Sequence, residues 1–283
     1  MLIRLGYEIE FESPAPVAMV ALLSVHPSRV HDLLEPDEMR TEPEFETSGY
    51  VDSFGNRCTR FVAPAGRLRL SCSTVIRDSG EPDRVNPDAR ALPVGELPNE
   101  ALSYLLSSRY CEVDRLSNIA FELFGGIESG WGRVQAICAW VHNKVAFDYS
   151  QARPTKTAMD VLTERVGVCR DFQHLAITFC RALNIPARYA TGYLGDIGVA
   201  PSSLPMDFSA WFEAYLDGQW WTFDARHNVP RIGRVLMATG RDASDVAITT
   251  SFGQADLRHF FVVTEEEVAA VQNRPPLETM DTM

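Results

Sequence analysis

The hydrophobic residues of this chain change their spacing part-way along, and that change limits the folds open to it. Near the start, apolar residues alternate with polar or small ones, at Ile3, Leu5, Tyr7, Ile9 and Phe11. The same period of two returns over 68–76, and it is typical of strands with one buried face. Over 113–124 and 131–145 the apolar residues follow a helical period instead. The pattern predicts an all-β region followed by a region that contains helices.

A segment rich in Pro, Asp and Gly separates the two regions. It reads DSGEPDRVNPDARALPVGELPN and covers 78–99. Such a composition cannot sustain a regular helix or strand ladder for long. We therefore expect an N-terminal β domain over 1–77, a linker over 78–99 and a core over 100–283.

Composition excludes several classes of protein. The chain has 38 acidic and 26 basic side chains, a formal charge of −12, so it lacks the basic footprint that binds nucleic acid. The longest largely apolar stretch, 17–25, is about half the length of a membrane-spanning helix. Charged residues interrupt the first eleven residues, where a signal peptide would have an unbroken apolar segment. We expect a cytoplasmic protein that does not engage membranes, with its six cysteines as free thiols and with no metal or cofactor motif.

One cysteine stands at the start of a predicted helix. The stretch GVCRDFQHLAITFCRAL places Phe172, Leu175, Phe179 and Leu183 at helical spacing, so Cys169 falls at the N-terminal end of a buried helix. Helix-start N–H groups and the positive end of the helix dipole favour a thiolate. Cys169 is therefore a candidate nucleophile, whereas the other five cysteines lie within strand or helix patterns and fit the role of small buried hydrophobes.

A hairpin follows this helix. Two strand-like runs, 209–216 and 219–224, flank Asp217-Gly218, a strong signal for a two-residue turn. Such a turn fixes the register and makes the first residue of the first run a diagonal neighbour of Asp224, where a base and its orienting carboxylate would sit. The fold class predicted is α+β: an all-β N-terminal domain, then a Cys-bearing helix packed on an antiparallel sheet.

Three short sequence motifs follow one another along the chain: GVCRDF at 167–172, an xAW element at 209–211, and a strand that ends in FD at 223–224. This order resembles the transglutaminase-like superfamily of papain-like cysteine peptidases in its bacterial members. The initial β region looks like the domain that precedes the core in these proteins, so the resemblance covers nearly the whole chain. It implies a papain/transglutaminase-like core with Cys169 as nucleophile, the His of an H-A-W element as base, and Asp224 as the residue that orients the base.

The base position departs from the family pattern. This chain has Asp-Phe-Ser-Ala-Trp, so Ser209 occupies the place where the resemblance implies a histidine. Serine neither accepts a proton near neutral pH nor forms a cation that stabilises a thiolate. The expected catalytic set is therefore Cys169 and Asp224 with Ser209 in the place of the imidazole.

Other histidines are poor substitutes on the sequence alone. His227 lies three residues beyond Asp224, so a continuing strand would turn it to the opposite face unless the chain bends sharply there. His174 lies about 140° around the helix from Cys169. We interpret both as incidental, together with the remaining histidines, His26, His31, His142 and His259.

Three further residues are candidate accessories. Asp207 shares the strand parity of position 209, with an ordinary turn as the alternative role. An acyl-transfer site needs oxyanion donors, for which the N–H of Cys169 and the side chain of Tyr149 are candidates, the latter with simple packing as the alternative. Trp211 is expected to form a hydrophobic wall beside the site.

Two functions remain open. The first is a thiol acyl-transfer enzyme, a cysteine peptidase or amidase or a transglutaminase-like acyl transferase, that acts on a peptide or amide substrate through Cys169. Hydrolysis and transamidation share an acyl-enzyme, so both are retained. The alternative is a catalytically weak or inactive relative that binds peptide or protein in the cleft, because loss of one member of a catalytic triad costs on the order of 10⁴- to 10⁶-fold in rate.

Overall fold

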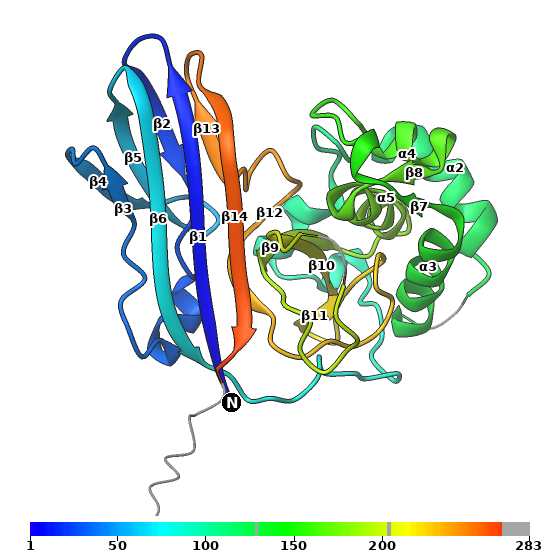
Figure 1. The fold of residues 1–283 in the computed structure, drawn as a ribbon. Coiled ribbons are helices and arrows are strands. Elements are labelled where there is room, and N and C mark those ends of the chain that lie inside the picture. Colours follow the sequence, from blue (N-terminus) through cyan, green and yellow to red (C-terminus); the bar gives the residue numbers. More distant parts are fainter. Residues whose placement is uncertain (128–129, 203–204, 268–283) are drawn as a thin grey trace, which may run out of the picture.

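The computed structural model describes residues 1–127, 130–202 and 205–267 and has two modules (Figure 1). The first contains two four-stranded antiparallel sheets, with strand orders β14-β1-β6-β3 and β13-β2-β5-β4. Their strands and one short 3₁₀ helix are β1 (Leu2–Ser13), β2 (Val17–Ala21), η1 (Pro27–Asp32), β3 (Arg40–Glu42), β4 (Thr47–Val51), β5 (Arg57–Ala63), β6 (Gly66–Arg77), β13 (Thr249–Ser251) and β14 (Asp256–Glu266).

The alternating pattern at the start of the chain faces the core between these sheets. Ile3, Leu5 and Ile9 of β1 are buried, as are Leu68 and Leu70 of β6. β1 pairs with β6 over its full length, so the apolar residues of both strands lie on one face. The prediction of strands with one buried side is confirmed.

Gly55-Asn56 stands between two strand-like runs, 50–54 and 57–62, and this pattern predicts a hairpin with a two-residue turn. The hairpin between β4 and β5 has a longer loop than that. β4 ends at Val51, and the Asp52 carboxylate accepts hydrogen bonds from the backbone N–H groups of Phe54 (2.8 Å) and Asn56 (2.9 Å). A side chain that bonds nearby backbone in this way competes with the strand ladder. The two-residue turn predicted here is therefore wrong, although the hairpin forms.

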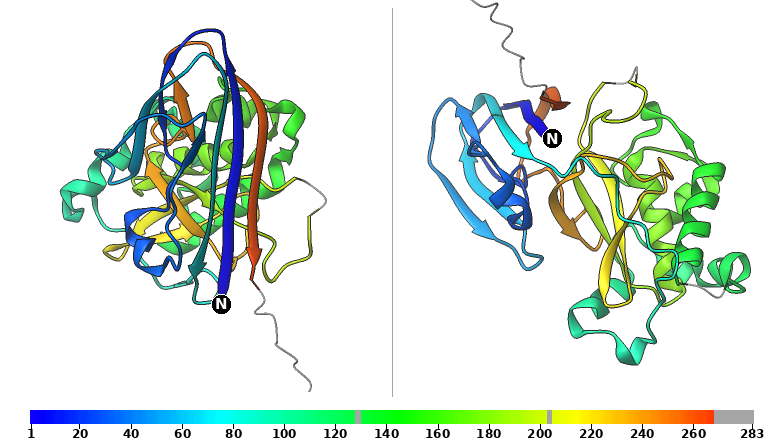
Figure 2. Two further views of the ribbon diagram at one scale, coloured as in Figure 1. Left: turned by 60° about the vertical axis from the view of Figure 1, so that its left-hand side comes forward. Right: turned by 90° about the horizontal axis from the view of Figure 1, so that it is seen from below.

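Two strands from late in the sequence complete the N-terminal sheets. β14 pairs with β1, from Ile3 opposite Glu266 to Glu12 opposite Asp256, and β13 pairs with β2. Residues 249–266, which the sequence pattern assigns to the core region, thus lie beside the first strands of the chain (Figure 2).

The second module combines helices with a third antiparallel sheet, ordered β11-β10-β9-β12, and a two-stranded parallel sheet, β7-β8. Figure 2 shows the helices on one side of the four-stranded sheet. Its elements are η2 (Val94–Glu96), α1 (Asn99–Leu102), η3 (Ser103–Leu105), α2 (Val113–Phe124), α3 (Gly130–Lys144), β7 (Ala146–Phe147), η4 (Tyr149–Gln151), α4 (Ala158–Glu164), β8 (Val166–Gly167), α5 (Cys169–Ala182), β9 (Ala187–Tyr193), β10 (Ser209–Leu216), β11 (Gln219–Phe223) and β12 (Val235–Gly240).

The predicted helix and hairpin at the centre of this module are confirmed. Cys169 begins α5, which is buried from Asp171 to Ala182 and packs on β9 and β10. The β10–β11 hairpin has the predicted register, with Glu213 opposite Thr222. Both turn residues, Asp217 and Gly218, have positive φ, as a twisted two-residue turn requires.

The segment 78–99 runs along the second module and bonds to it. The Asp83 carboxylate accepts from the Arg231 backbone N–H at 2.8 Å, and the Ala89 carbonyl accepts from the N–H of Trp131 at 2.9 Å. Within the described residues, no helix is both long enough and apolar enough to cross a bilayer.

Candidate functional site

Cys169 lies at the first position of α5 and is half-buried. The turn before it is held by Asp171, whose carboxylate accepts from the Val168 N–H at 3.0 Å and pairs with Arg170 at 3.0 Å. This capping satisfies one of the donors at the helix start. Arg170 is therefore engaged with its neighbouring carboxylate.

The surroundings of Cys169 favour the protonated thiol. Burial raises its pKa to about 11, the Asp207 charge acts in the same direction, and the Arg226 charge and the Arg170 backbone N–H act against them. The helix-start N–H lowers the pKa of Cys169, as expected, but desolvation outweighs this effect.

Asp224 follows β11 and is the most heavily bonded carboxylate of the site. It is 6% exposed and accepts from the backbone N–H groups of Arg226 (2.9 Å) and His227 (3.1 Å), and its Oδ2 lies 2.9 Å from His227 Nδ1. Burial by itself raises the pKa of this carboxyl, but the Arg234 charge and the His227 hydrogen bonds outweigh it and hold the pKa well below its ordinary value. Asp224 is therefore a buried anion at neutral pH.

Arg234 supplies the opposite charge. Its guanidinium donates to Asp224 at 2.9 Å and to Asp83 at 2.9 Å, and it lies 5.1 Å from the centre of the Trp211 ring. Asp83 belongs to the segment that precedes the core, so this segment contributes to the electrostatics of the site. Trp211 is buried against this cation and is not among the residues that line the neighbouring cavity.

Gln173 connects the cysteine helix to Asp224. Its amide nitrogen donates to the Asp224 carboxylate and to the Ala210 carbonyl, both at 3.1 Å, and its amide oxygen accepts from the Ala225 N–H at 3.1 Å. Residues four apart lie on one face of a helix, so Cys169 is one turn away on the face that meets Asp224. The three bonds lock α5 against the end of the β10–β11 hairpin.

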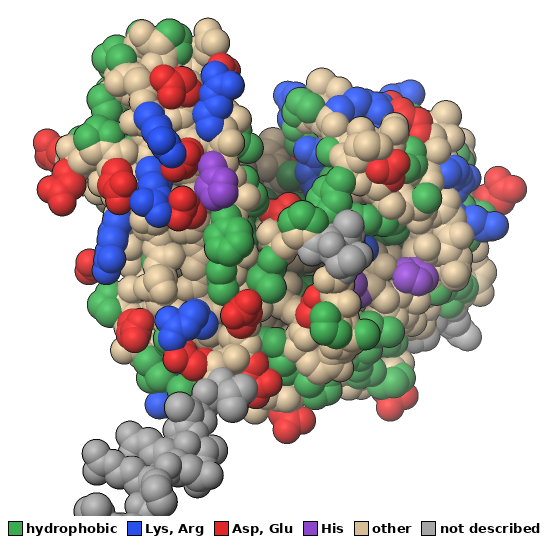
Figure 3. Space-filling model, viewed as in Figure 1, with side chains coloured by type: hydrophobic (Ala, Val, Ile, Leu, Met, Phe, Trp, Pro, Cys, Tyr) green, Lys and Arg blue, Asp and Glu red, His purple; other side chains and the backbone are tan. Residues whose placement is uncertain are grey.

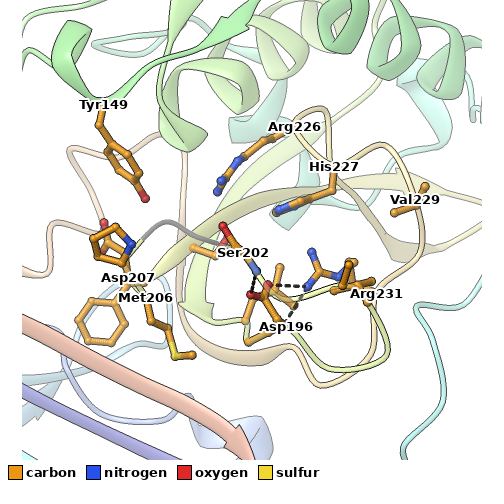
Figure 4. Close-up of a pocket in the computed structure, with 16 residues that line it drawn as sticks. Tyr149, Asp196, Ser202, Met206, Asp207, Arg226, His227, Val229 and Arg231 are labelled. Carbon is orange, nitrogen blue, oxygen red and sulfur yellow. Dashed lines mark hydrogen bonds and ion pairs between the residues drawn. The ribbon is translucent and has the colours of Figure 1, made fainter.

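A cavity of about 600 Å³ opens beside this frame, between the chain before β10 and the turn after β11 (Figure 4). A notch separates the two modules on the face shown in Figure 3, where acidic and basic side chains are interspersed. The polar side chains that line the cavity are Tyr149, Asp196, Ser202, Asp207, Ser209, Arg226, His227 and Arg231. Cys169 is not a lining residue, yet its thiol is close enough to Asp207 and Arg226 for their charges to shift its pKa.

The surroundings of Asp207 change the pKa of its carboxyl group. It is half-buried, and burial raises the pKa of its carboxyl to about 6, against the opposing effects of the Phe208 N–H and the Arg226 charge. Tyr149, from the short η4 helix, points into the same cavity in Figure 4. Burial also raises the pKa of the Tyr149 hydroxyl, so it remains a neutral hydrogen-bond donor.

Ser209 and His227 line the cavity together. Ser209 is 6% exposed, and its hydroxyl has no hydrogen-bond partner among the described residues. The chain bends after Phe223, where the Asn228 N–H donates to the Asp224 carbonyl at 2.8 Å, and this bend turns the His227 side chain back over Asp224. The sharp bend that would keep His227 from the opposite face is therefore present, because the strand ends before it.

The remaining histidine near the helix is a core residue. The His174 ring is fully buried, stacks on Tyr110 and accepts from the Ala243 N–H at 3.1 Å. Burial lowers the pKa of His174 to about 3, so it is neutral. No group of three or more metal-binding side chains occurs among residues 1–127, 130–202 and 205–267.

The sequence did not predict three residues of the site: Gln173, Arg234 and Asp83. Gln173 carried one usable signal, because it is a polar residue four positions after Cys169 in a run that is otherwise largely apolar. Arg234 and Asp83 carried none, because Arg234 lies 10 residues from Asp224 and 151 residues from Asp83, and only the fold brings them together.

Comparisons with known proteins agree with this architecture. A family model described as the transglutaminase-like superfamily matches residues 117–225. An uncharacterized protein of Mycobacterium leprae is 25% identical over 248 residues, which cover 84% of this chain and 87% of the relative. A crystal structure from Cytophaga hutchinsonii, described as a candidate cysteine protease, matches with a TM-score of 0.82 and 32% identity over 95% of this chain and 92% of that one. The chain therefore belongs to the transglutaminase-like superfamily.

Proposed function

We propose that this protein is a thiol acyl-transfer enzyme in which Cys169 attacks the carbonyl carbon of a peptide or amide. The observation that carries the proposal is the frame around the cysteine. Cys169 begins a buried helix, and Gln173 ties that helix to a buried, ionised Asp224. The Cytophaga hutchinsonii relative, described as a candidate cysteine protease, supports a peptide as the substrate.

Each residue of the site has a distinct role in the proposed reaction. The Cys169 sulfur forms the acyl bond, and the helix-start N–H groups donate to the oxyanion that develops on the carbonyl oxygen. Tyr149 points into the adjacent cavity and is a second candidate donor. Release of the acyl group by water gives hydrolysis, and release by an amine gives transamidation. Neither route requires a cofactor.

A second candidate function is peptide or protein binding without turnover. The raised pKa of the Cys169 thiol and the serine at position 209 favour this alternative. A thiol that stays protonated and has no proton acceptor at position 209 is a weak nucleophile.

Acylation by p-nitrophenyl acetate separates the two functions. The wild-type protein is expected to release a burst of p-nitrophenolate equal to one acyl group per chain, and intact-mass analysis with peptide mapping places that group on Cys169. Cys169→Ala abolishes the burst, whereas the control Cys58→Ala, at a buried cysteine of the N-terminal module, retains it. A wild-type protein that is never acylated at Cys169 between about pH 5 and about pH 9 overturns the enzyme proposal and favours binding.

A further inference from the structure

Position 209 offers space where the family pattern has an imidazole. Ser209 is the first residue of β10, it lines the cavity, and its buried hydroxyl has no partner among the described residues. A buried hydroxyl is ordinarily hydrogen-bonded, so an orphan of this kind calls for an explanation. Its small side chain leaves the neighbouring volume to another group.

His227 reaches the same cavity from the turn after β11. Its side chain is 22% exposed, it lines the same cavity as Ser209, and Figure 4 shows its ring directed into the cavity. Its Nδ1 lies 2.9 Å from Asp224 Oδ2. Because an ionised carboxylate only accepts hydrogen bonds, Nδ1–H is the donor to Asp224, and in the neutral ring this tautomer leaves a lone pair on Nε2.

Asp224 is a hydrogen-bond partner of both the His227 imidazole and the helix that begins at Cys169. The same carboxylate accepts from His227 and from Gln173, and Gln173 lies one helical turn from Cys169 on the same face. Arg226, next to His227 in the chain, is also near enough to Cys169 for its charge to act on the thiol pKa. The turn that carries His227 and the helix that begins at Cys169 are thus both bonded to Asp224.

We propose that His227 supplies the imidazole that position 209 lacks, so that the proton acceptor of Cys169 comes from the turn after β11 instead of from β10. This inference rests on the proposed thiol acyl-transfer function. The family match ends at residue 225, two residues before this histidine, and so it carries no statement about it.

The proton follows a defined route. As the sulfur of Cys169 forms a C–S bond to the carbonyl carbon, the thiol proton moves to His227 Nε2 and the π electrons of the carbonyl move to oxygen. When the carbonyl re-forms, the C–N bond breaks, and Nε2 returns the proton to the leaving amine. Water then enters: His227 takes a proton from it, the new C–O bond forms, and the C–S bond breaks with the proton passing back to sulfur.

This arrangement accommodates a thiol that is protonated at rest. A general base takes the proton during the attack, so no preformed thiolate is needed. Asp224 contacts the imidazole directly, and the charged residues that line the cavity with it are Asp196, Asp207, Arg226 and Arg231.

The test compares the acylation rate of Cys169 by p-nitrophenyl acetate in the wild type, His227→Gln and His31→Gln. Glutamine keeps a donor for Asp224 and, at a partly exposed position, preserves the fold. We expect His227→Gln to slow acylation by about 10²- to 10⁴-fold near neutral pH. His31→Gln, at a histidine whose side chain is 75% exposed in the N-terminal module, leaves the rate unchanged.

Two readouts distinguish a proton acceptor from a merely structural residue. The difference between wild type and His227→Gln is expected to vanish at a pH high enough to ionise the thiol by itself. In His227→Ala, added imidazole is expected to restore acylation in proportion to its concentration, with no effect on Cys169→Ala.

The outcomes separate this inference from the proposed function. If Cys169 is acylated in the wild type and His227→Gln reacts within about twofold of it, the inference is overturned and the function stands. A slow His227→Gln that neither recovers at high pH nor responds to imidazole in the alanine variant also overturns it. If Cys169 is never acylated in the wild type, the proposed function fails and the inference falls with it.

Discussion

Removal of the Arg234 guanidinium tests the electrostatic design of the site. Arg234→Met keeps much of the side-chain volume but leaves the Asp224 carboxylate, 6% exposed, without its cation. Breaking a buried ion pair from one side costs about 3–5 kcal/mol. Asp224 keeps its hydrogen bonds from Gln173 and from the turn that carries His227, so we expect the lower end, about 3 kcal/mol.

The loss of folding stability in Arg234→Met should be larger at neutral pH than in mild acid. In the wild type the pKa of Asp224 lies below its ordinary value, so its contribution to stability is present above about pH 4 and is lost as the pH falls further. In Arg234→Met, burial raises this pKa, and protonation removes the uncompensated charge in mild acid. The stability difference between wild type and variant is therefore largest at neutral pH and shrinks toward about pH 4.

Urea denaturation followed by tryptophan fluorescence at about pH 7 and about pH 4 measures this difference. Arg188→Met is the matched control, because Arg188 pairs with Glu213 at 2.6 Å nearer the surface and its loss is expected to cost about 1 kcal/mol or less. A loss below about 1 kcal/mol for Arg234→Met, or one that is equal at both pH values, would refute the reasoning.

Two more predictions concern the sheet and the thiol. Gly192→Ala places a Cβ in steric conflict with the Val235 carbonyl oxygen, so it should lower the free energy of unfolding by about 2 kcal/mol or more in urea denaturation. Gly95→Ala, with nothing within 4 Å of its Cβ, should leave the free energy of unfolding nearly unchanged. Asp207→Asn removes a negative charge that raises the Cys169 pKa, so alkylation of Cys169 by iodoacetamide near neutral pH should become faster, by up to about tenfold for one pKa unit; an unchanged or slower rate contradicts the assigned proximity of the two groups.

Local chemistry explains what the sequence could predict. The Asp217-Gly218 turn determines its own hairpin and register, because both residues tolerate positive φ without help from the rest of the fold. The start of α5 at Cys169 followed from helical spacing within a single segment. These features place Cys169, Ser209 and Asp224 in one region, although their catalytic roles stay predictions.

Non-local contacts explain what the sequence could not predict. The raised pKa of Cys169 depends on burial by distant segments, which a helix-start argument does not contain. The position of His227 depends on where β11 ends, and a difference of one residue reverses the face on which a strand side chain lies. The partnership of Arg234 with Asp83 joins the core to the segment before it, a pairing with no signature in either segment alone.

The pairing of β14 with β1 has a consequence for synthesis on the ribosome. The first strand emerges early, but its outer edge stays without its native partner until the chain has been translated from Ser13, where β1 ends, to Asp256, where β14 begins. Until then β1 exposes unpaired N–H and C=O groups, the kind of edge that recruits other chains. The second module, whose sheet order uses only β9 to β12, can complete its own hydrogen bonding first. Chaperone protection of the nascent chain is therefore needed most at its beginning, and a premature stop before residue 256 leaves that edge open permanently.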